Sequence, residues 1–514
     1  MAKAVVIGSG FAGLASAVRL LRKGYEVSVL EAQESLGGRA AVFKQDGFTF
    51  DAGPTVITAP HLLNELFELL GEDPKDFFEL IPIDPFYRII FNDGSKFDYV
   101  GDEERIIENI RALSPGDIDG YRRLAKHAES IFDVGYTQLA DEPFDTVASM
   151  MRAVPDMVRL QNYKSVYSLV SKYIKDERLR MAFSFEPLLV GGNPTTITSI
   201  YLLIHWLERK WGVFFVKGGT GALVEALKKL LEMKGAKIYT GASVKKIEIE
   251  RGQVKRVITH DERIFECDLV VSNADPVRVY RDMIDQKHRS KHSDFRLGLK
   301  KHSMSLFVAY FGTKKLYPDL AHHTILMGPR YQGLLNDIFS KKILAEDFSL
   351  YLHAPTRTDS TLAPPGHECF YVLSPVPNKD GKINWKQEEQ IYKDKIYRWL
   401  DKNHLPGLLE NLTVDFSVTP DYFEHNLQSE KGAAFGLEPS FSQSAYFRFH
   451  NKSEDIKGLY FVGANTHPGA GVPGVLNSAK IIEKLIPDLE NKFTSHGFTP
   501  KKNFTDYAEG IISE

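Results

Sequence analysis

The sequence predicts an α/β fold that begins with a nucleotide-binding βαβ unit, and three observations support this prediction. The apolar run AVVI at residues 4–7 is typical of a buried parallel strand. The helix expected after it opens on the spacing G-x-G-x-x-G, formed by Gly8, Gly10 and Gly13. A second strand, EVSVLE, ends on the acidic residue Glu31.

Each of these positions has a physical role in nucleotide binding. The first glycine permits a tight turn, the second lets the backbone approach a pyrophosphate, and the third lets the helix pack closely on its strand. The Glu31 carboxylate can accept hydrogen bonds from a ribose 2′-hydroxyl, and it disfavours a 2′-phosphate, so NADP is not expected here. The alternative is an ordinary βαβ unit whose glycines only form a turn.

Composition excludes several other classes of protein. The chain has 514 residues, enough for two or more folding units, and its 25% charged residues and net charge of −3 do not suggest a nucleic-acid partner. The two cysteines, Cys267 and Cys369, form no C-x-x-C pair, which disfavours disulfide frameworks and iron–sulfur clusters and favours a reducing cytoplasm. With the fingerprint starting at residue 4, no signal peptide is expected, and no apolar run approaches the ~20 residues that span a bilayer.

Further elements follow along the chain. Residues 76–214 are expected to be mostly helical. A helix at 220–234, a strand at 237–239 and a hairpin around Gly252 indicate a return to the first α/β layer, and the strand in CDLVVSNAD continues it. The runs SLFVAYFG and CFYVLSPV predict strands of a second domain within 290–440. The strand LYFVG then leads through a glycine-rich turn into a helix from about residue 474, and residues 487–514 are expected to form a short helix and a tail.

One loop and the histidines complete the candidate sites. In Gly37-Gly38-Arg39 the glycines let the backbone come close to the phosphates, and Arg39 can neutralise a pyrophosphate; the alternative is a surface arginine. His322, His323 and His467 stand in no H-E-x-x-H or H-x-H pattern, and adjacent residues of a strand point to opposite faces. We therefore expect no metal site.

The fingerprint, the G-G-R loop and the terminal motif GANTHPGAGVPGV together resemble the FAD-dependent carotenoid desaturases, in particular the bacterial-type phytoene desaturases. The likeness extends through GFTFDAGPTVIT, FSFEPLLVGGNP, WGVFFVKGGTGALV, LAHHTILMGPRY and AEDFSLYLHAP, and so covers the chain to about residue 486. It implies a Rossmann-like FAD-binding domain of the amine oxidase and GDP-dissociation-inhibitor type. It also implies a mixed sheet-and-helix substrate domain with a helical region that faces the membrane.

The resemblance also implies domain boundaries and site residues. The discontinuous FAD-binding domain comprises 1–75, 215–290 and 440–490, the substrate domain comprises 76–214 and 291–439, and 491–514 form a tail. The residues implied to hold FAD are Gly8, Gly10, Gly13, Glu31, Gly38, Arg39, Val244, Gly463, Ala464, Gly471, Val472, Pro473 and Gly474. Asn465 and Asn477 stand where the family pattern has glycine, and Asn465 is expected to alter a backbone angle without preventing binding.

The activity implied is the desaturation of phytoene, a C40 polyene precursor, toward lycopene or a related polyene by hydride transfer to FAD. Such chemistry needs an apolar tunnel more than an acid–base triad, so no catalytic residue is predicted. Oxygen or a quinone is the implied electron acceptor. The alternatives are another desaturase or isomerase of the same fold, and a prenyl-lipid-binding protein without redox chemistry.

A water-insoluble substrate also predicts peripheral contact of a cytoplasmic protein with a membrane. The candidate surface is the helical region 146–175, which has an apolar set (Met150, Met151, Val154, Met157, Val158, Leu160) and a basic set (Arg152, Arg159, Lys164, Lys172, Lys175). The alternative is an internal amphipathic helix packed on the second domain.

Overall fold

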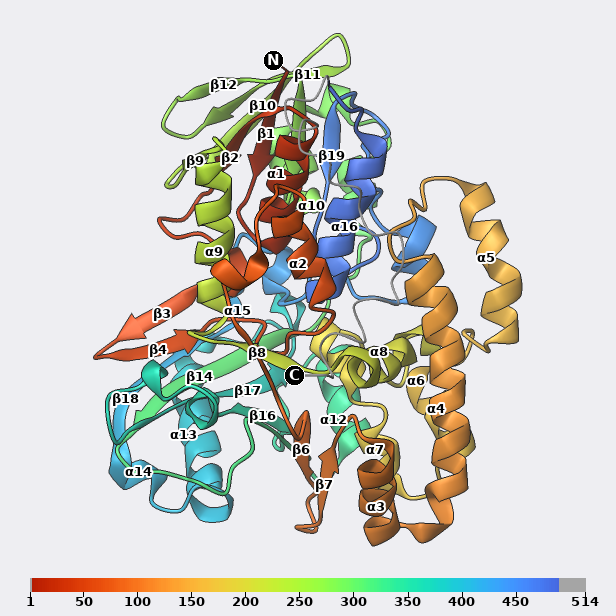
Figure 1. Cartoon of the computed structure of the whole chain (residues 1–514), viewed down its shortest axis with the longest axis vertical. Coiled ribbons are helices and arrows are strands. Elements are labelled where there is room, and N and C mark those ends of the chain that lie inside the picture. The colour runs from red at the N-terminus through yellow and green to blue at the C-terminus, as the bar shows by residue number, and fades with distance from the viewer. Residues whose placement is uncertain (1, 490–514) are drawn as a thin grey trace.

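The computed structural model describes residues 2–489, so the predicted tail at 491–514 lies outside the described residues. A five-stranded parallel sheet, ordered β19-β13-β1-β2-β9, forms the upper part of Figure 1. Its strands are β1 (Lys3–Ile7), β2 (Glu26–Leu30), β9 (Lys237–Tyr239), β13 (Leu269–Ser272) and β19 (Leu459–Phe461). Three segments far apart in the sequence therefore build one sheet.

Three helices pack on this sheet through one apolar cluster: α1 (Phe11–Arg22), α9 (Thr220–Met233) and α16 (Val472–Leu485). α1 is buried along most of its length, as expected for the crossover helix of a βαβ unit. A three-stranded antiparallel sheet lies beside the five-stranded sheet, at the top of Figure 1. It consists of β10 (Val244–Glu250), β11 (Gln253–Thr259) and β12 (Ile264–Glu266). The predicted helix at 220–234, strand at 237–239 and hairpin at Gly252 are confirmed.

The second layer is a seven-stranded mixed sheet, ordered β18-β14-β17-β16-β15-β6-β7. Its strands are β6 (Tyr87–Ile90), β7 (Lys96–Tyr99), β14 (Ser305–Thr313), β15 (His323–Leu326), β16 (Leu350–His353), β17 (Glu368–Val376) and β18 (Leu412–Val418). Alternate residues of β14 divide between its faces: Phe307 and Phe311 pack toward helix α13 (Trp385–Asn403), and Val308 and Tyr310 face the other way.

The expectation that 76–214 is mostly helical was partly wrong. Strands β5 (Leu80–Pro82), β6 and β7 lie in this segment; β5 pairs with β8 (Phe214–Val216), and β6 and β7 form a hairpin. The hairpin turns on Asn92-Asp93-Gly94, where Gly94 has φ +83°, a conformation that favours glycine. Its strands alternate buried residues with half-buried or exposed ones, a period-2 pattern that is short beside the longer helical segments.

The helices of this segment stand at the right of Figure 1. They are α3 (Glu103–Leu113), α4 (Ile118–Phe132), α5 (Val147–Arg159), α6 (Val166–Tyr173), α7 (Glu177–Ala182) and α8 (Leu203–Trp211). The remaining elements are β3 (Val42–Gln45), β4 (Phe48–Asp51), α2 (His61–Glu68), α10 (Pro276–Arg278), α11 (Asp294–Gly298), α12 (Tyr331–Asn336), α14 (Leu408–Asn411) and α15 (Pro420–His425). No helix among residues 2–489 is both long and apolar enough to cross a bilayer.

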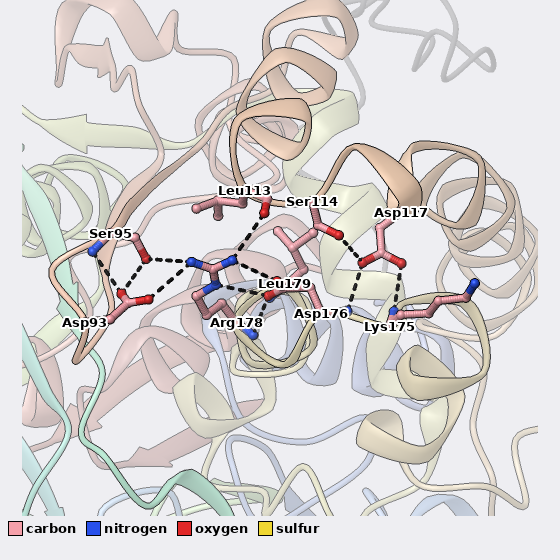
Figure 2. A network of polar contacts seen from close by, with 9 residues as sticks. All are labelled: Asp93, Ser95, Leu113, Ser114, Asp117, Lys175, Asp176, Arg178 and Leu179. Atoms are coloured by element: carbon pink, nitrogen blue, oxygen red, sulfur yellow. Dashed lines mark hydrogen bonds and ion pairs between the residues drawn. The ribbon is translucent and has the colours of Figure 1, made fainter.

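A polar network fixes these helices to the β6–β7 hairpin. Figure 2 shows the Arg178 guanidinium between the carboxylates of Asp93 and Asp176, at 3.2 and 2.8 Å, and it also donates to the Leu113 carbonyl. The Asp117 carboxylate accepts hydrogen bonds of 2.8 Å from the backbone N–H groups of Lys175 and Asp176. The junction between α6 and α7 is therefore tied to α3, α4 and the hairpin.

Helix α5 is the exception to this packing, because Ala153 is its only buried residue. Its apolar side chains Val147, Met151 and Val158 are 59%, 61% and 61% exposed. Met150, Val154 and Met157 are half-buried. The prediction that Leu160 belongs to an outward apolar face was wrong, because Leu160 is buried in the main core just beyond the end of the helix.

Candidate active site

One large cavity lies between the five-stranded and seven-stranded sheets and has a volume of about 590 Å³. Eleven of the thirteen predicted site residues line it: Gly8, Gly10, Glu31, Gly38, Arg39, Val244, Ala464, Gly471, Val472, Pro473 and Gly474. Gly13 and Gly463 do not line it. Residues from both ends of the chain therefore meet at one site.

The N-terminal glycine loop has the geometry of a close-approach turn. Gly8 has φ +89°, and a Cβ on Gly10 would lie 2.6 Å from Asn273 Oδ1. The buried Glu31 carboxylate accepts hydrogen bonds from the Ser9 backbone N–H at 2.8 Å and the Ser9 hydroxyl at 2.6 Å, and so ties the loop to the end of β2. Its further lone pairs remain available to ribose hydroxyls.

Arg39 brings a positive charge to the cavity. Its guanidinium donates to the carbonyl of Ala434 at 2.6 Å and to the hydroxyl of Ser429 at 3.0 Å, and no ion pair is formed by it within residues 2–489. Burial lowers its pKa, opposed by the charge of nearby Asp275. A desolvated guanidinium without a carboxylate bonded to it fits an anionic group such as a pyrophosphate.

The C-terminal glycine turn supplies a helix N-terminus. α16 begins after Gly471, which has φ +96° and gives the helix no side-chain cap, so its first N–H groups are free to face a ligand. A Cβ on Gly474 would lie 2.7 Å from the Gly469 carbonyl oxygen, and one on Gly463 would lie 2.3 Å from Asn273 Nδ2. The backbone contact therefore favours glycine at Gly474, and a φ of +101° favours glycine at Gly463.

Asn465 and Asn477, which stand where the family pattern has glycine, both have a place in the structure around the cavity. The expectation that Asn465 alters a backbone angle stays a prediction; its φ is not positive, and its side-chain oxygen accepts a hydrogen bond of 2.6 Å from the Leu437 N–H. Asn477 lines the cavity, as does Tyr136, and burial raises the pKa of the Tyr136 phenol above its usual value. The glycine cradles, Arg39 and the α16 N-terminus together fit a dinucleotide such as FAD.

Replacing Glu31 by alanine is expected to weaken FAD binding about ten- to hundredfold, because charge-assisted hydrogen bonds contribute about 1.5–3 kcal/mol. The change also leaves the Ser9 N–H without its acceptor. Titration of the apoprotein with FAD measures the effect, and Glu34→Ala, an exposed acid on the same loop that does not line the cavity, serves as the matched control. Equal affinities for the wild type and Glu31→Ala would contradict the role of Glu31.

Beyond the nucleotide end, the cavity walls are mostly apolar. They come from α8, α12, β14 and β15 and from the turn at 186–190, with side chains including Leu188, Leu203, Leu207, Val308, Ile325 and Leu334. Such walls exclude water and suit a hydrocarbon chain.

A buried pair of carboxyl groups interrupts this apolar wall. Glu208 of α8 lines the cavity and accepts a hydrogen bond of 2.7 Å from the Tyr87 hydroxyl through Oε1, while its Oε2 has no partner. Glu186 lies behind it, bonded at 2.5 Å to the Tyr99 hydroxyl, which also contacts His205. Burial raises the pKa of Glu208 to about 8, and burial together with the charge of Glu208 raises that of Glu186 well above its usual value. Sequence analysis missed both residues.

Three imidazoles, His322, His323 and His353, also meet in the core, with nitrogen atoms all within 4.8 Å of one another. His323 begins β15 and His322 precedes it, so strand alternation does not separate them, and both reach His353 on β16. The Nε2 atoms of His322 and His353 are 3.0 Å apart, and His323 Nδ1 is 2.6 Å from the Tyr351 hydroxyl. Burial lowers the pKa of His322 to about 3. The prediction of no metal site stays a prediction, but its argument from strand alternation was wrong.

Comparison with known proteins agrees with this geometry. The family described as flavin containing amine oxidoreductase matches residues 11–481. A phytoene desaturase (lycopene-forming) from Pseudescherichia vulneris is 46% identical over 492 residues, which is 95% of this chain and 100% of that protein. A phytoene desaturase (neurosporene-forming) from Rhodobacter capsulatus is 41% identical over 494 residues, which is 95% of this chain and 94% of that protein.

Solved structures show the same fold at low sequence identity. An oxidoreductase from Methanosarcina mazei has a TM-score of 0.64 at 18% identity and covers 94% of this chain and 100% of its own. A putrescine oxidase variant has a TM-score of 0.63 at 13% identity and covers 94% of this chain and 98% of its own. Family and fold identify the cofactor as FAD. The chain belongs to the flavin containing amine oxidoreductase family, and within it to the bacterial-type phytoene desaturases.

Proposed function

We propose that this protein is an FAD-dependent phytoene desaturase that introduces double bonds into a C40 polyene and forms lycopene or a close relative. The observation that carries the proposal is the match of 46% identity across the whole length of a lycopene-forming desaturase. The cavity supports it, because a cradle for a dinucleotide opens into apolar walls of the kind that a polyene requires.

Different residues of the chain have different roles in such a reaction. Bound FAD supplies the acceptor for the hydride that leaves the allylic carbon. Arg39, the glycine loop and the start of α16 hold the dinucleotide, and the apolar walls hold the polyene beside it and exclude water. The non-catalytic lipid-binding alternative offers no reason for these nucleotide-cradling groups to converge on one cavity.

Expression in a host that accumulates phytoene tests the proposal. We expect coloured polyenes with longer conjugation, identified by chromatography and absorption spectra. The product also separates this function from the nearest alternative within the fold, since relatives include neurosporene-forming and zeta-carotene-forming enzymes. Unchanged phytoene in cells that contain soluble, flavin-loaded protein would contradict it.

We further propose that the enzyme binds peripherally to a membrane in the cytoplasm through helix α5. An insoluble substrate must come from a bilayer, and α5 presents Val147, Met151 and Val158 to solvent beside Arg152 and Arg159. α5 packs on the turn Ala445–Phe447, whose first residue lines the cavity. This contact supports a route from the membrane to the site.

The electron acceptor is proposed to be oxygen or a quinone. Reoxidation of the reduced holoenzyme in liposomes, with and without a quinone under anaerobic conditions, distinguishes the two.

A further inference from the structure

We propose that Glu208 is the catalytic residue that accepts the proton lost from the polyene, an inference that rests on the proposed desaturase function. The reaction removes two hydrogens from neighbouring carbons, and the flavin takes only one of them as hydride. A group of the protein next to the polyene must therefore be able to take the other as a proton.

Glu208 differs from the other carboxylates that line the cavity. Within residues 2–489 these are Glu31, Asp51, Asp275 and Glu208. Glu31 is bonded to Ser9, Asp51 accepts from the Thr220 N–H at 2.8 Å, and Asp275 accepts from the N–H groups of Val277 and Glu430. Glu208 alone among the four has a buried oxygen, Oε2, without a partner. An unmade hydrogen bond on a buried carboxylate is costly, so the atom is poised to receive a proton.

A series of contacts links the nucleotide loops to Glu208. The backbone of Gly53 packs closely on the Arg39 carbonyl, because a Cβ added to Gly53 would lie 1.8 Å from the Arg39 carbonyl oxygen. The Thr55 hydroxyl, two residues further on, is 3.0 Å from the Tyr351 hydroxyl.

Tyr351 continues these contacts toward Glu208. Its hydroxyl is 2.6 Å from His323 Nδ1, and the His323 ring lies 5.9 Å from that of Tyr87, the partner of Glu208. Glu208 is thus linked to the Arg39 loop through the core, and Thr55 and Tyr351 at the start of this series line the same cavity as Glu208.

Several titratable and charged groups surround Glu208. The titratable and charged groups facing it are Tyr87 of β6, Tyr99 of β7, Tyr121 of α4, Glu186, His323, Tyr351, and His205 and Arg209 of α8 itself.

Burial favours the neutral form of these neighbours. It raises the pKa of the tyrosines and of Glu186 and lowers that of His205 to about 3. Arg209 is engaged by Tyr121 and Glu103. With its own pKa raised to about 8, ionised Glu208 is a stronger base than an ordinary carboxylate.

The step balances without a further reagent. On one carbon a C–H bond breaks and its electron pair leaves with the hydrogen to the bound flavin. On the neighbouring carbon a C–H bond breaks, the proton passes to Glu208 Oε2, and its electron pair forms the second bond of the new C=C. Glu208 releases the proton before the next cycle, and the oxygen or quinone proposed above removes the two electrons from the flavin.

His467 is the competing base in the cavity wall, because its Nδ1 also has no partner. Burial lowers the pKa of His467 to about 4, which makes its neutral form a weak proton acceptor. The two candidates predict different pH profiles: a base with a pKa of about 8 loses activity below that pH, whereas one of about 4 gives a flat profile through neutrality.

The test is anaerobic single turnover of the FAD-loaded enzyme with phytoene in liposomes, followed as bleaching of the flavin. We expect the wild-type rate to rise with pH to a plateau, with a midpoint of about 8. Glu208→Gln is expected to slow bleaching about 10²- to 10⁴-fold while FAD content and bound phytoene are unchanged. Glu186→Gln is the matched control, because Glu186 is as buried as Glu208 but does not line the cavity. This variant should bleach its flavin at a rate within a few-fold of the wild type and with the same pH midpoint.

Infrared difference spectroscopy of the resting protein gives a readout independent of turnover. The carbonyl stretch of a protonated carboxyl should titrate with the kinetic midpoint in the wild type and Glu186→Gln and be absent at that pH in Glu208→Gln. Wild-type bleaching rates in Glu208→Gln, or an infrared midpoint that differs from the kinetic one, would overturn the role of Glu208. If the wild type and Glu186→Gln bind phytoene but never desaturate it, the proposed function itself fails. If the variants do not fold, agreement or disagreement between the kinetic and infrared midpoints of the wild type still tests the role of Glu208.

Discussion

Replacing Gly13 by alanine is expected to destabilise the protein by about 3 kcal/mol or more and to prevent FAD retention. The added Cβ would lie 2.0 Å from the carbonyl oxygen of Gly8. Both groups are backbone: Gly13 sits in the first turn of α1, and Gly8 follows β1, which is paired on both sides by β2 and β13. Neither can move without separating the helix from the sheet, and the phosphate-binding turn lies between them.

The measurement is the denaturant midpoint together with the flavin content of the purified protein. Gly116→Ala is the matched control, because nothing lies within 4 Å of its added Cβ and its φ is not positive. It should match the wild type in both measurements. A Gly13→Ala protein with its full complement of flavin and an unchanged midpoint would show that the turn relaxes at no cost, contrary to the packing seen here.

The nucleotide half of the molecule could be predicted from sequence because its signals are local. The glycine spacing, the apolar strands and the helical period at 220–234 each occupy a few consecutive residues, and the structure has the elements at those positions. That three distant segments form one sheet came from the family resemblance, since no local pattern specifies which strands pair. The assignment of single residues to FAD stays a prediction for Glu31→Ala and Gly13→Ala to test.

The polar groups on the substrate side could not be predicted, because they are products of tertiary packing. Glu208 lies in the helical stretch HWLERKW, where it is followed directly by Arg209 and Lys210, and a run of three charged residues usually indicates exposure to solvent. Only the structure shows that the Glu208 side chain is turned into the core, against Tyr87 from a hairpin far away in sequence, while Lys210 stays exposed. His353 likewise joins His322 and His323 through the pairing of β15 with β16.

Helix α5 gives the last prediction: exchange of Val147, Met151 and Val158 for glutamate is expected to abolish liposome binding while the protein stays folded and keeps its FAD. The three side chains are 59%, 61% and 61% exposed, so the acidic groups remain hydrated and folding loses almost no packing. At an anionic bilayer the same changes remove the inserted apolar face and add negative charge beside Arg152 and Arg159.

Co-sedimentation with anionic liposomes and desaturation of liposome-borne phytoene are measured on the same samples. The matched control replaces Ile264, Ile391 and Leu409 by glutamate; these are 57%, 63% and 47% exposed and lie on other elements. If exposed apolar area anywhere drove adsorption, both triple variants would lose binding alike. Loss confined to the α5 variant, with activity falling in parallel, identifies α5 as the docking helix. Unfolding of the α5 variant would instead favour the internal packing role, and undiminished binding and activity would exclude this helix as the docking surface.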